Sequence, residues 1–133
     1  MKTDEQILKE LERGIEGLSF MSESDYPFEV VRRDSVREIT TPYLRGLANQ
    51  GADAPVEVES LEVFFGPAAS EADWKGAAEL KTAKSYQALI RLLKDNLEDV
   101  KVYKVGRINI PVYIIGRSPA GNWLGLSTRV VET

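Results

Sequence analysis

The chain has 133 residues, a formal net charge of −4 and neither cysteine nor histidine. The lack of these two residue types excludes disulfides, thiol nucleophiles, imidazole bases and the usual zinc ligands. No stretch reaches the ~18 apolar residues of a membrane helix, and residues 1–5 lack the basic and then apolar layout of a signal peptide. The sequence therefore predicts one soluble, cytoplasmic domain over residues 1–133 that does not bind membranes.

Acidic side chains are concentrated in the middle of the chain. Between Arg45 and Lys75 there is no lysine or arginine, but there are six acidic residues: Asp53, Glu57, Glu59, Glu62, Glu71 and Asp73. A region of one charge sign attracts a basic partner, whereas the net negative charge disfavours nonspecific binding to nucleic acid. A solvated acidic surface that keeps the protein soluble is the simpler interpretation of the same pattern.

The first predicted element is an amphipathic helix over residues 4–17. Thr3 and Gln6 have the spacing of a capping box, and Gly17 is a suitable stop. A polar and aromatic loop over residues 18–27 follows. Because Pro27 has no amide hydrogen, strand pairing is expected to begin at or after Phe28.

The first strand is predicted to extend from residue 28 to residue 39, with an interruption at residues 33–35. Thr41 as N-cap and Pro42 at the first helical position then predict a short helix over residues 42–50. The alternating and then apolar residues 56–65 predict the second strand.

Two helices and three strands complete the prediction. Ser70 and Asp73 mark a helix start with Trp74 in its first turn, and a long helix over residues 81–97 follows with an apolar stripe. The last three strands cover residues 100–105, 108–115 and 123–131. Two sets of apolar residues at period two give the last two strands one buried face each: Ile108, Ile110, Val112 and Ile114, then Leu124, Leu126 and Val130.

The predicted order is helix, strand, helix, strand, two helices and three strands. Helical crossovers follow the two early strands and the last three strands form a meander, so we expect an α+β chain with a mixed five-stranded sheet. Four helices can cover both faces of that sheet, which favours a three-layer α/β/α sandwich.

Three acidic residues are candidates for chemistry. Glu23, Asp25 and Glu29 are close carboxylates flanked by aromatic residues and proline, and paired carboxylates can act as acid and base. No glycine-rich phosphate loop, nucleophile elbow or calcium-loop spacing accompanies them. The pattern favours solvated loop carboxylates, or a Glu23 that caps nearby amides, over an enzyme.

The tryptophans and the last residue are the other candidates. Trp74 either anchors a helix on the core or is exposed as an interface contact, and the pattern leaves both open. Trp123 is expected to pack across strands. Glu132 and the α-carboxylate of Thr133 place two negative charges side by side, although an ordinary terminus is the simpler interpretation.

Three motifs together resemble the cyanobacterial nuclease A inhibitor family: LSFMSESDYPFEV at residues 18–30, SPAGN at 118–122 and STRVVET at 127–133. Residues 57–65, 73–74 and 95–103 fall in the same order, so the resemblance spans nearly the whole chain. Members of this family inhibit a sugar-nonspecific DNA/RNA nuclease that uses a divalent metal, and their fold is the PR-1-like α/β/α sandwich.

The resemblance also implies roles for individual residues. Glu23 is expected to meet active-site groups of the nuclease, Trp74 to be an aromatic contact, and the terminal oxygens of Thr133 to reach the partner's catalytic magnesium in the complex. Carboxylates can occupy the places of phosphate oxygens without offering a scissile bond. The implied protein is a noncatalytic inhibitor without a cofactor of its own.

This sequence departs from the family pattern in its basic residues: Lys75, Lys81 and Lys84 after Trp74, and Arg32, Arg33 and Arg37 near the end of the first strand. These residues keep an alternative open, a noncatalytic interaction module of the same fold that binds another basic partner.

Overall fold

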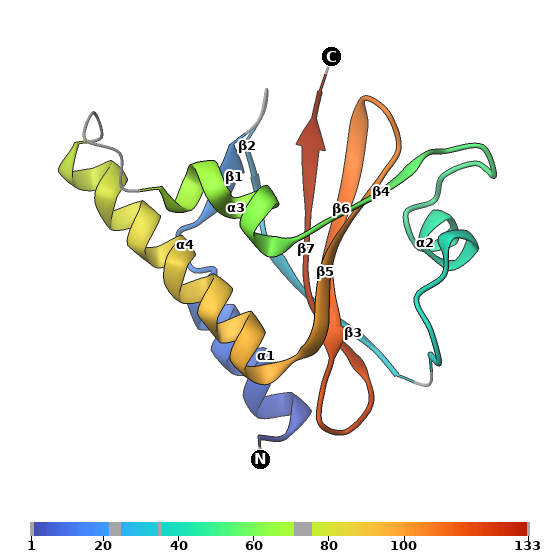
Figure 1. Ribbon diagram of the computed structural model, residues 1–133, viewed down its shortest axis with the longest axis horizontal. Helices are drawn as coiled ribbons and strands as arrows, with labels where there is room; N and C mark the ends of the chain where they lie inside the picture. The colour runs from blue at the N-terminus through green and yellow to red at the C-terminus, as the bar shows by residue number, and fades with distance from the viewer. Residues whose placement is uncertain (1, 22–24, 35, 71–75, 133) are drawn as a thin grey trace.

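The computed structural model describes the chain except for residues 1, 22–24, 35, 71–75 and 133. The described part contains four α-helices and seven β-strands (Figure 1). In chain order these are α1 (Asp4–Gly14), β1 (Ser19–Met21), β2 (Asp25–Pro27), β3 (Glu29–Arg33), α2 (Thr41–Leu47), β4 (Val56–Glu59), α3 (Leu61–Ala69), α4 (Ala77–Asn96), β5 (Glu98–Val105), β6 (Asn109–Arg117) and β7 (Trp123–Val131).

Five strands form the main sheet in the order β3-β7-β6-β5-β4, and every neighbouring pair is antiparallel. The five strands agree with the prediction, but the expectation of a mixed sheet is wrong. The reason lies in the placement of β3 and β4. They occupy opposite edges of the sheet, so the α2 crossover between them does not create a parallel neighbour.

The meander β5-β6-β7 follows the predicted pattern closely. Ile110, Val112 and Ile114 are buried on one face of β6, and the amide of Gly121 closes the turn after β6 by donating to the carbonyl of Ser118 at 2.9 Å. Ile108 is the exception. It precedes β6 and is 57% exposed, because the tight connection from β5 occupies this position.

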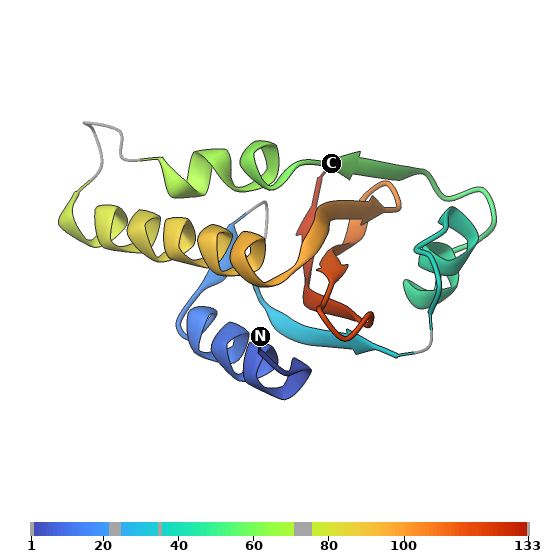
Figure 2. The same ribbon diagram turned by 60° about the horizontal axis from the view of Figure 1, so that its bottom comes forward.

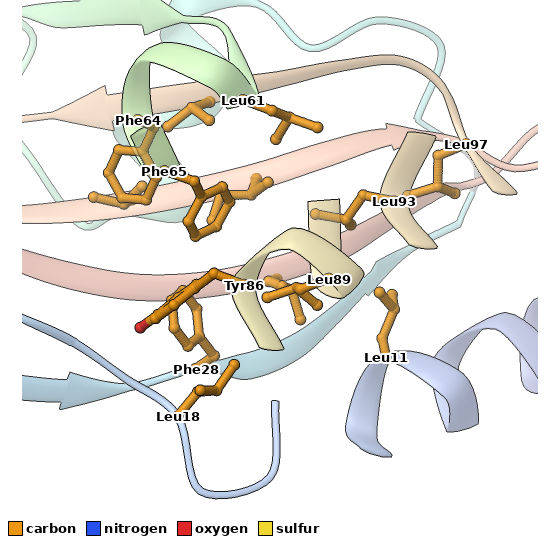
Figure 3. Packing of buried hydrophobic residues seen from close by; sticks show 14 of the residues in the cluster. Leu11, Leu18, Phe28, Leu61, Phe64, Phe65, Tyr86, Leu89, Leu93 and Leu97 are labelled. Carbon is orange, nitrogen blue, oxygen red and sulfur yellow. The ribbon is translucent and has the colours of Figure 1, made fainter. Parts of the chain in front are cut away.

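Helices lie on both faces of the sheet (Figure 2). The larger hydrophobic cluster joins α1, α3 and α4 to one face, and Figure 3 shows Tyr86, Leu89 and Leu93 of α4 pointing at the sheet beside Phe65 of α3. A smaller cluster joins Leu44 of α2 to the opposite face. Burial on both faces explains why the central strands are nearly continuously apolar.

The predicted helix caps are present with shifts of a few residues. Thr3 and Gln6 form the expected capping box, although α1 ends at Gly14 rather than at Gly17. The N-cap of α2 is Thr40 instead of Thr41, and its side chain accepts from the amide of Tyr43 at 3.2 Å. Pro42 therefore lies one position further into the helix.

The predicted strand over residues 56–65 is wrong beyond Glu59. Ser60 caps α3 by accepting a hydrogen bond from the amide of Val63 at 3.1 Å. Leu61, Phe64 and Phe65 are buried at helical spacing. Ser70, the predicted start of the next helix, is instead the C-cap residue of α3, and α4 begins at Ala77.

Candidate functional site

The three predicted contact residues Glu23, Trp74 and Thr133 lie outside the described residues. The described elements nevertheless show which parts of the chain each of them joins or follows. Glu23 belongs to the segment joining β1 to β2, Trp74 to the segment joining α3 to α4, and Thr133 follows the end of β7.

The hairpin β1–β2 is a feature that the sequence analysis missed. Met21 pairs with Asp25, so the two strands are in register up to the residues on either side of 22–24. The base of the hairpin is fixed to the core. The hydroxyl of Tyr86 donates to the carbonyl of Ser19 at 2.7 Å, and the ring of Phe20 stacks on that of Phe64 with 4.3 Å between centroids.

The hairpin lies beside the last part of β7. The hydroxyl of Thr128 donates to the carbonyl of Pro27 at 3.1 Å. Since β3 and β7 are antiparallel, with Glu29 opposite Ser127, the chain before Glu29 and the chain after Ser127 run toward the same end of the molecule (Figure 1). The described residues that adjoin positions 23 and 133 are thus both directed to this end.

A cavity of about 510 Å³ lies between the helix pair α3–α4 and the hairpin. Its lining comes from all three elements and is mostly apolar: Ser19, Phe20, Phe64, Pro67, Ala68, Ala78, Glu79, Thr82 and Tyr86. The side chain of Gln87 donates to the carbonyl of Ala69 at 2.8 Å and so holds the end of α3 against α4. The described chain before residues 71–75 is therefore fixed to α4.

Charged groups meet at the end of β7. The Nζ of Lys104 in β5 lies 3.1 Å from the Oε1 of Glu132 and 3.6 Å from the Oε1 of Glu59. Burial alone would lower the pKa of the Lys104 ammonium, but its hydrogen bond to Glu132 and the charges of Glu59, Glu132 and Glu57 outweigh burial and raise it. The amide of Glu132 also donates to the carbonyl of Ile108 at 3.0 Å.

The acidic region predicted from the sequence is partly neutralised. Glu59 pairs with Lys104, and Glu62 pairs with Lys94 at 2.8 Å. Glu71 and Asp73 lie outside the described residues. The negative potential expected for this stretch is therefore reduced by two lysines from α4 and β5.

Of the candidate carboxylates Asp25 and Glu29, the structure describes the side chain of only one. Glu29 is exposed on β3, and the side chain of Asp25 is not described. Over the described ranges, no group of three or more Asp and Glu side chains is placed to hold a metal ion. Among the same residues, no helix is long and apolar enough to cross a membrane.

Comparison with known protein families gives a match over residues 5–133, to the family described as nuclease A inhibitor-like protein. This chain belongs to that family. No curated protein matches it. The predicted resemblance is therefore confirmed, and it covers nearly the whole chain.

In this nuclease A inhibitor-like protein, sequence reasoning identified neither the hairpin nor Lys104. The hairpin has only three residues in each strand, too few for a periodic signal. Lys104 did leave a signal. It shares the face of buried Val102 on β5, where the alternation calls for another apolar residue, and Glu57 stands directly opposite it on β4.

Proposed function

We propose that this protein is a noncatalytic inhibitor of a metal-dependent, sugar-nonspecific DNA/RNA nuclease, acting in the cytoplasm. The observation that carries the proposal is membership of the nuclease A inhibitor-like family over residues 5–133. The helices on both faces of the sheet are consistent with the PR-1-like α/β/α sandwich of that family, which we include in the proposal.

In the proposed mechanism the inhibitor occupies the place of the nucleic-acid phosphate. The carboxylate of Glu23 meets active-site groups of the nuclease, the terminal oxygens of Thr133 reach its catalytic magnesium, and Trp74 provides an aromatic contact. Magnesium prefers oxygen ligands, and an α-carboxylate, with a reference pKa of ~3.3 to 3.7, is ionised at neutral pH. Neither carboxylate offers a phosphodiester bond to cleave.

Two features of the described residues support this mode of binding. The hairpin on either side of residues 22–24 and the end of β7 are directed to one end of the molecule and joined through Thr128. The hairpin is fixed to the core at Ser19, and the end of β7 is bonded at Glu132 to the connection between β5 and β6. Contacts carried on fixed elements lose less conformational entropy on binding, which favours tight inhibition.

The proposal is tested by titrating a magnesium-dependent, sugar-nonspecific nuclease with this protein while DNA digestion is followed. Activity should fall linearly and disappear near one equivalent of inhibitor. Because digestion of RNA uses the same metal site, it should be lost in parallel. Full activity at a micromolar excess over several such nucleases would contradict the proposal.

One observation favours a second candidate, an interaction module that binds a different basic partner. Lys81 and Lys84 are exposed on α4, close in sequence to Trp74, and a basic surface there opposes the docking of a basic nuclease through Trp74. A different basic partner would bind through another surface of the same fold. Affinity capture from the native cell separates the two functions. A nuclease among the retained proteins supports inhibition, and a different partner without a nuclease supports the module.

A further inference from the structure

Lys104 is the most enclosed cation for which the structure describes an ion pair. Its side chain is 12% exposed, whereas the other lysines and arginines in the described ion pairs are at least 37% exposed. It sits on β5, and its partners come from two other parts of the chain. Glu59 belongs to β4, and Glu132 follows β7, which lies two strands away from β5.

The contacts of Lys104 reach the chain just after the end of β7. Val131 is the last residue of the strand, so Glu132 lies beyond the sheet ladder. Glu132 is held there at two points: its amide donates to Ile108, and its carboxylate accepts from Lys104. Glu59, the second partner of Lys104, keeps the ammonium on this side of the sheet.

We propose that Lys104 is a positioning residue that fixes Glu132 and thereby sets the direction in which the chain continues to Thr133. The inference rests on the proposed function, in which Thr133 reaches the partner's magnesium. The proposal also gives different roles to the two negative charges expected at the end of the chain. The carboxylate of Glu132 is engaged within the protein, and under the proposed function that of Thr133 binds the partner's magnesium.

The direction in which binding to the nuclease changes when Lys104 is replaced distinguishes positioning from long-range electrostatics. Replacing Lys104 by methionine makes the protein one unit more negative, which by long-range attraction alone would strengthen binding to a basic nuclease. Loss of positioning weakens binding instead, because the chain at Glu132 must then be ordered at the moment of association.

The experiment measures the inhibition constant of Lys104→Met beside a matched control, Lys94→Met. Lys94 also pairs with a glutamate, Glu62, at 2.8 Å, but this pair joins α4 to α3 and does not include Glu132. We expect roughly a tenfold or greater increase in the inhibition constant for Lys104→Met and less than a twofold change for the control. Lys104→Arg, which keeps the charge, should recover most of the potency.

A double-mutant cycle with Glu132→Gln tests the route of the effect. Glu132 is exposed, so this substitution leaves folding intact. If Lys104 acts through Glu132, the single variants weaken inhibition by similar factors and the double variant is no weaker than either. If instead the factors of the two single variants multiply in the double variant, Glu132 contacts the nuclease directly, and the inference is overturned.

The NMR order parameter of the Glu132 amide gives a readout without a nuclease. We expect it to fall in Lys104→Met and to stay unchanged in Lys94→Met. An unchanged value in both overturns the inference, even if inhibition is lost. If the wild-type protein inhibits no nuclease, the proposed function fails, while this measurement still decides whether Lys104 fixes the end of β7.

Discussion

At the scale of single residues, charge is the property that the proposed mechanism requires of Glu23. Glutamine has the same size and keeps the hydrogen-bonding oxygen, but it cannot replace a phosphate oxygen against a cationic metal site. The change Glu23→Gln therefore removes the charge and little else.

We expect Glu23→Gln to weaken nuclease inhibition by about 2 kcal/mol or more, the range of interface hot spots. The matched control is Glu12→Gln, a change of the same kind at an exposed position of α1. Inhibition constants from DNA digestion at several inhibitor concentrations give the comparison. Equal potency of the two variants would remove Glu23 from the proposed contact.

Single residues also show where sequence reasoning succeeds. Trp123 was predicted to pack across strands. It is buried, its ring lies 4.9 Å from the guanidinium carbon of Arg117 on the neighbouring strand, and its indole N–H donates to the carbonyl of Val36. Strand alternation predicts the first contact. The second depends on a loop 87 residues earlier in the chain, which no local pattern can reveal.

At the scale of elements, the close approach of β6 and β7 depends on Gly125. A methyl group at this position would lie 1.9 Å from the carbonyl oxygen of Ile114, on the paired strand. Only a shift of the backbone in the centre of the sheet relieves such a clash.

Gly125→Ala should therefore lower the free energy of unfolding by about 3 kcal/mol or more. Gly46→Ala is the control, because no atom within 4 Å meets the added methyl and Gly46 lies inside α2. There alanine should raise stability by up to ~1 kcal/mol. Urea unfolding of both variants checks the two signs, and a stable Gly125→Ala protein would contradict the described pairing.

The end of β7 gives a second prediction at this scale. Adding residues after Thr133 removes the α-carboxylate that the proposed magnesium contact requires, while the sheet ladder ends at Val131 and is left intact. Inhibition should weaken strongly and the melting temperature should stay the same. An extended protein that inhibits as well as the original would show that the terminus is passive.

Elements were predicted correctly where one signal was strong and wrongly where two competed. The meander β5-β6-β7 has long apolar alternation, and α1 has a complete capping box. The run from Leu61 to Phe65 is short and mostly apolar, which fits a strand or a helix equally well. Ser60, a good N-cap, was the signal that could have decided it.

At the scale of the whole molecule, burial acts on several groups that titrate at high pH. Burial, together with the charge of Asp99, raises the pKa of Tyr103. Burial also raises the pKa of Tyr113, against the lowering effect of Arg33 and Arg129. The pKa of Lys104 is raised as well, by its carboxylate partners.

These three shifts predict a loss of stability in alkali. Each folded pKa exceeds the unfolded value, so the unfolded chain releases its protons first as the pH rises. The stabilisation is complete below about pH 10 and is lost as the pH passes through the folded values. Urea unfolding at pH 8, 10 and 11 should show a falling midpoint, and Tyr103→Phe should reduce the slope. A constant midpoint would contradict the described burial.

The position of β7 in the sheet has a consequence for synthesis on the ribosome. β3 is made early, but its sheet neighbour β7 is the last strand in the sequence, and Asp4 of α1 accepts a hydrogen bond from Asn122, 118 residues later. During translation, β3 therefore has no neighbouring strand to pair with until β7 emerges. The half-made chain exposes a strand edge that invites aggregation or chaperone binding. Under the proposed function, a cell gains protection from the nuclease only after the last strand has emerged and paired.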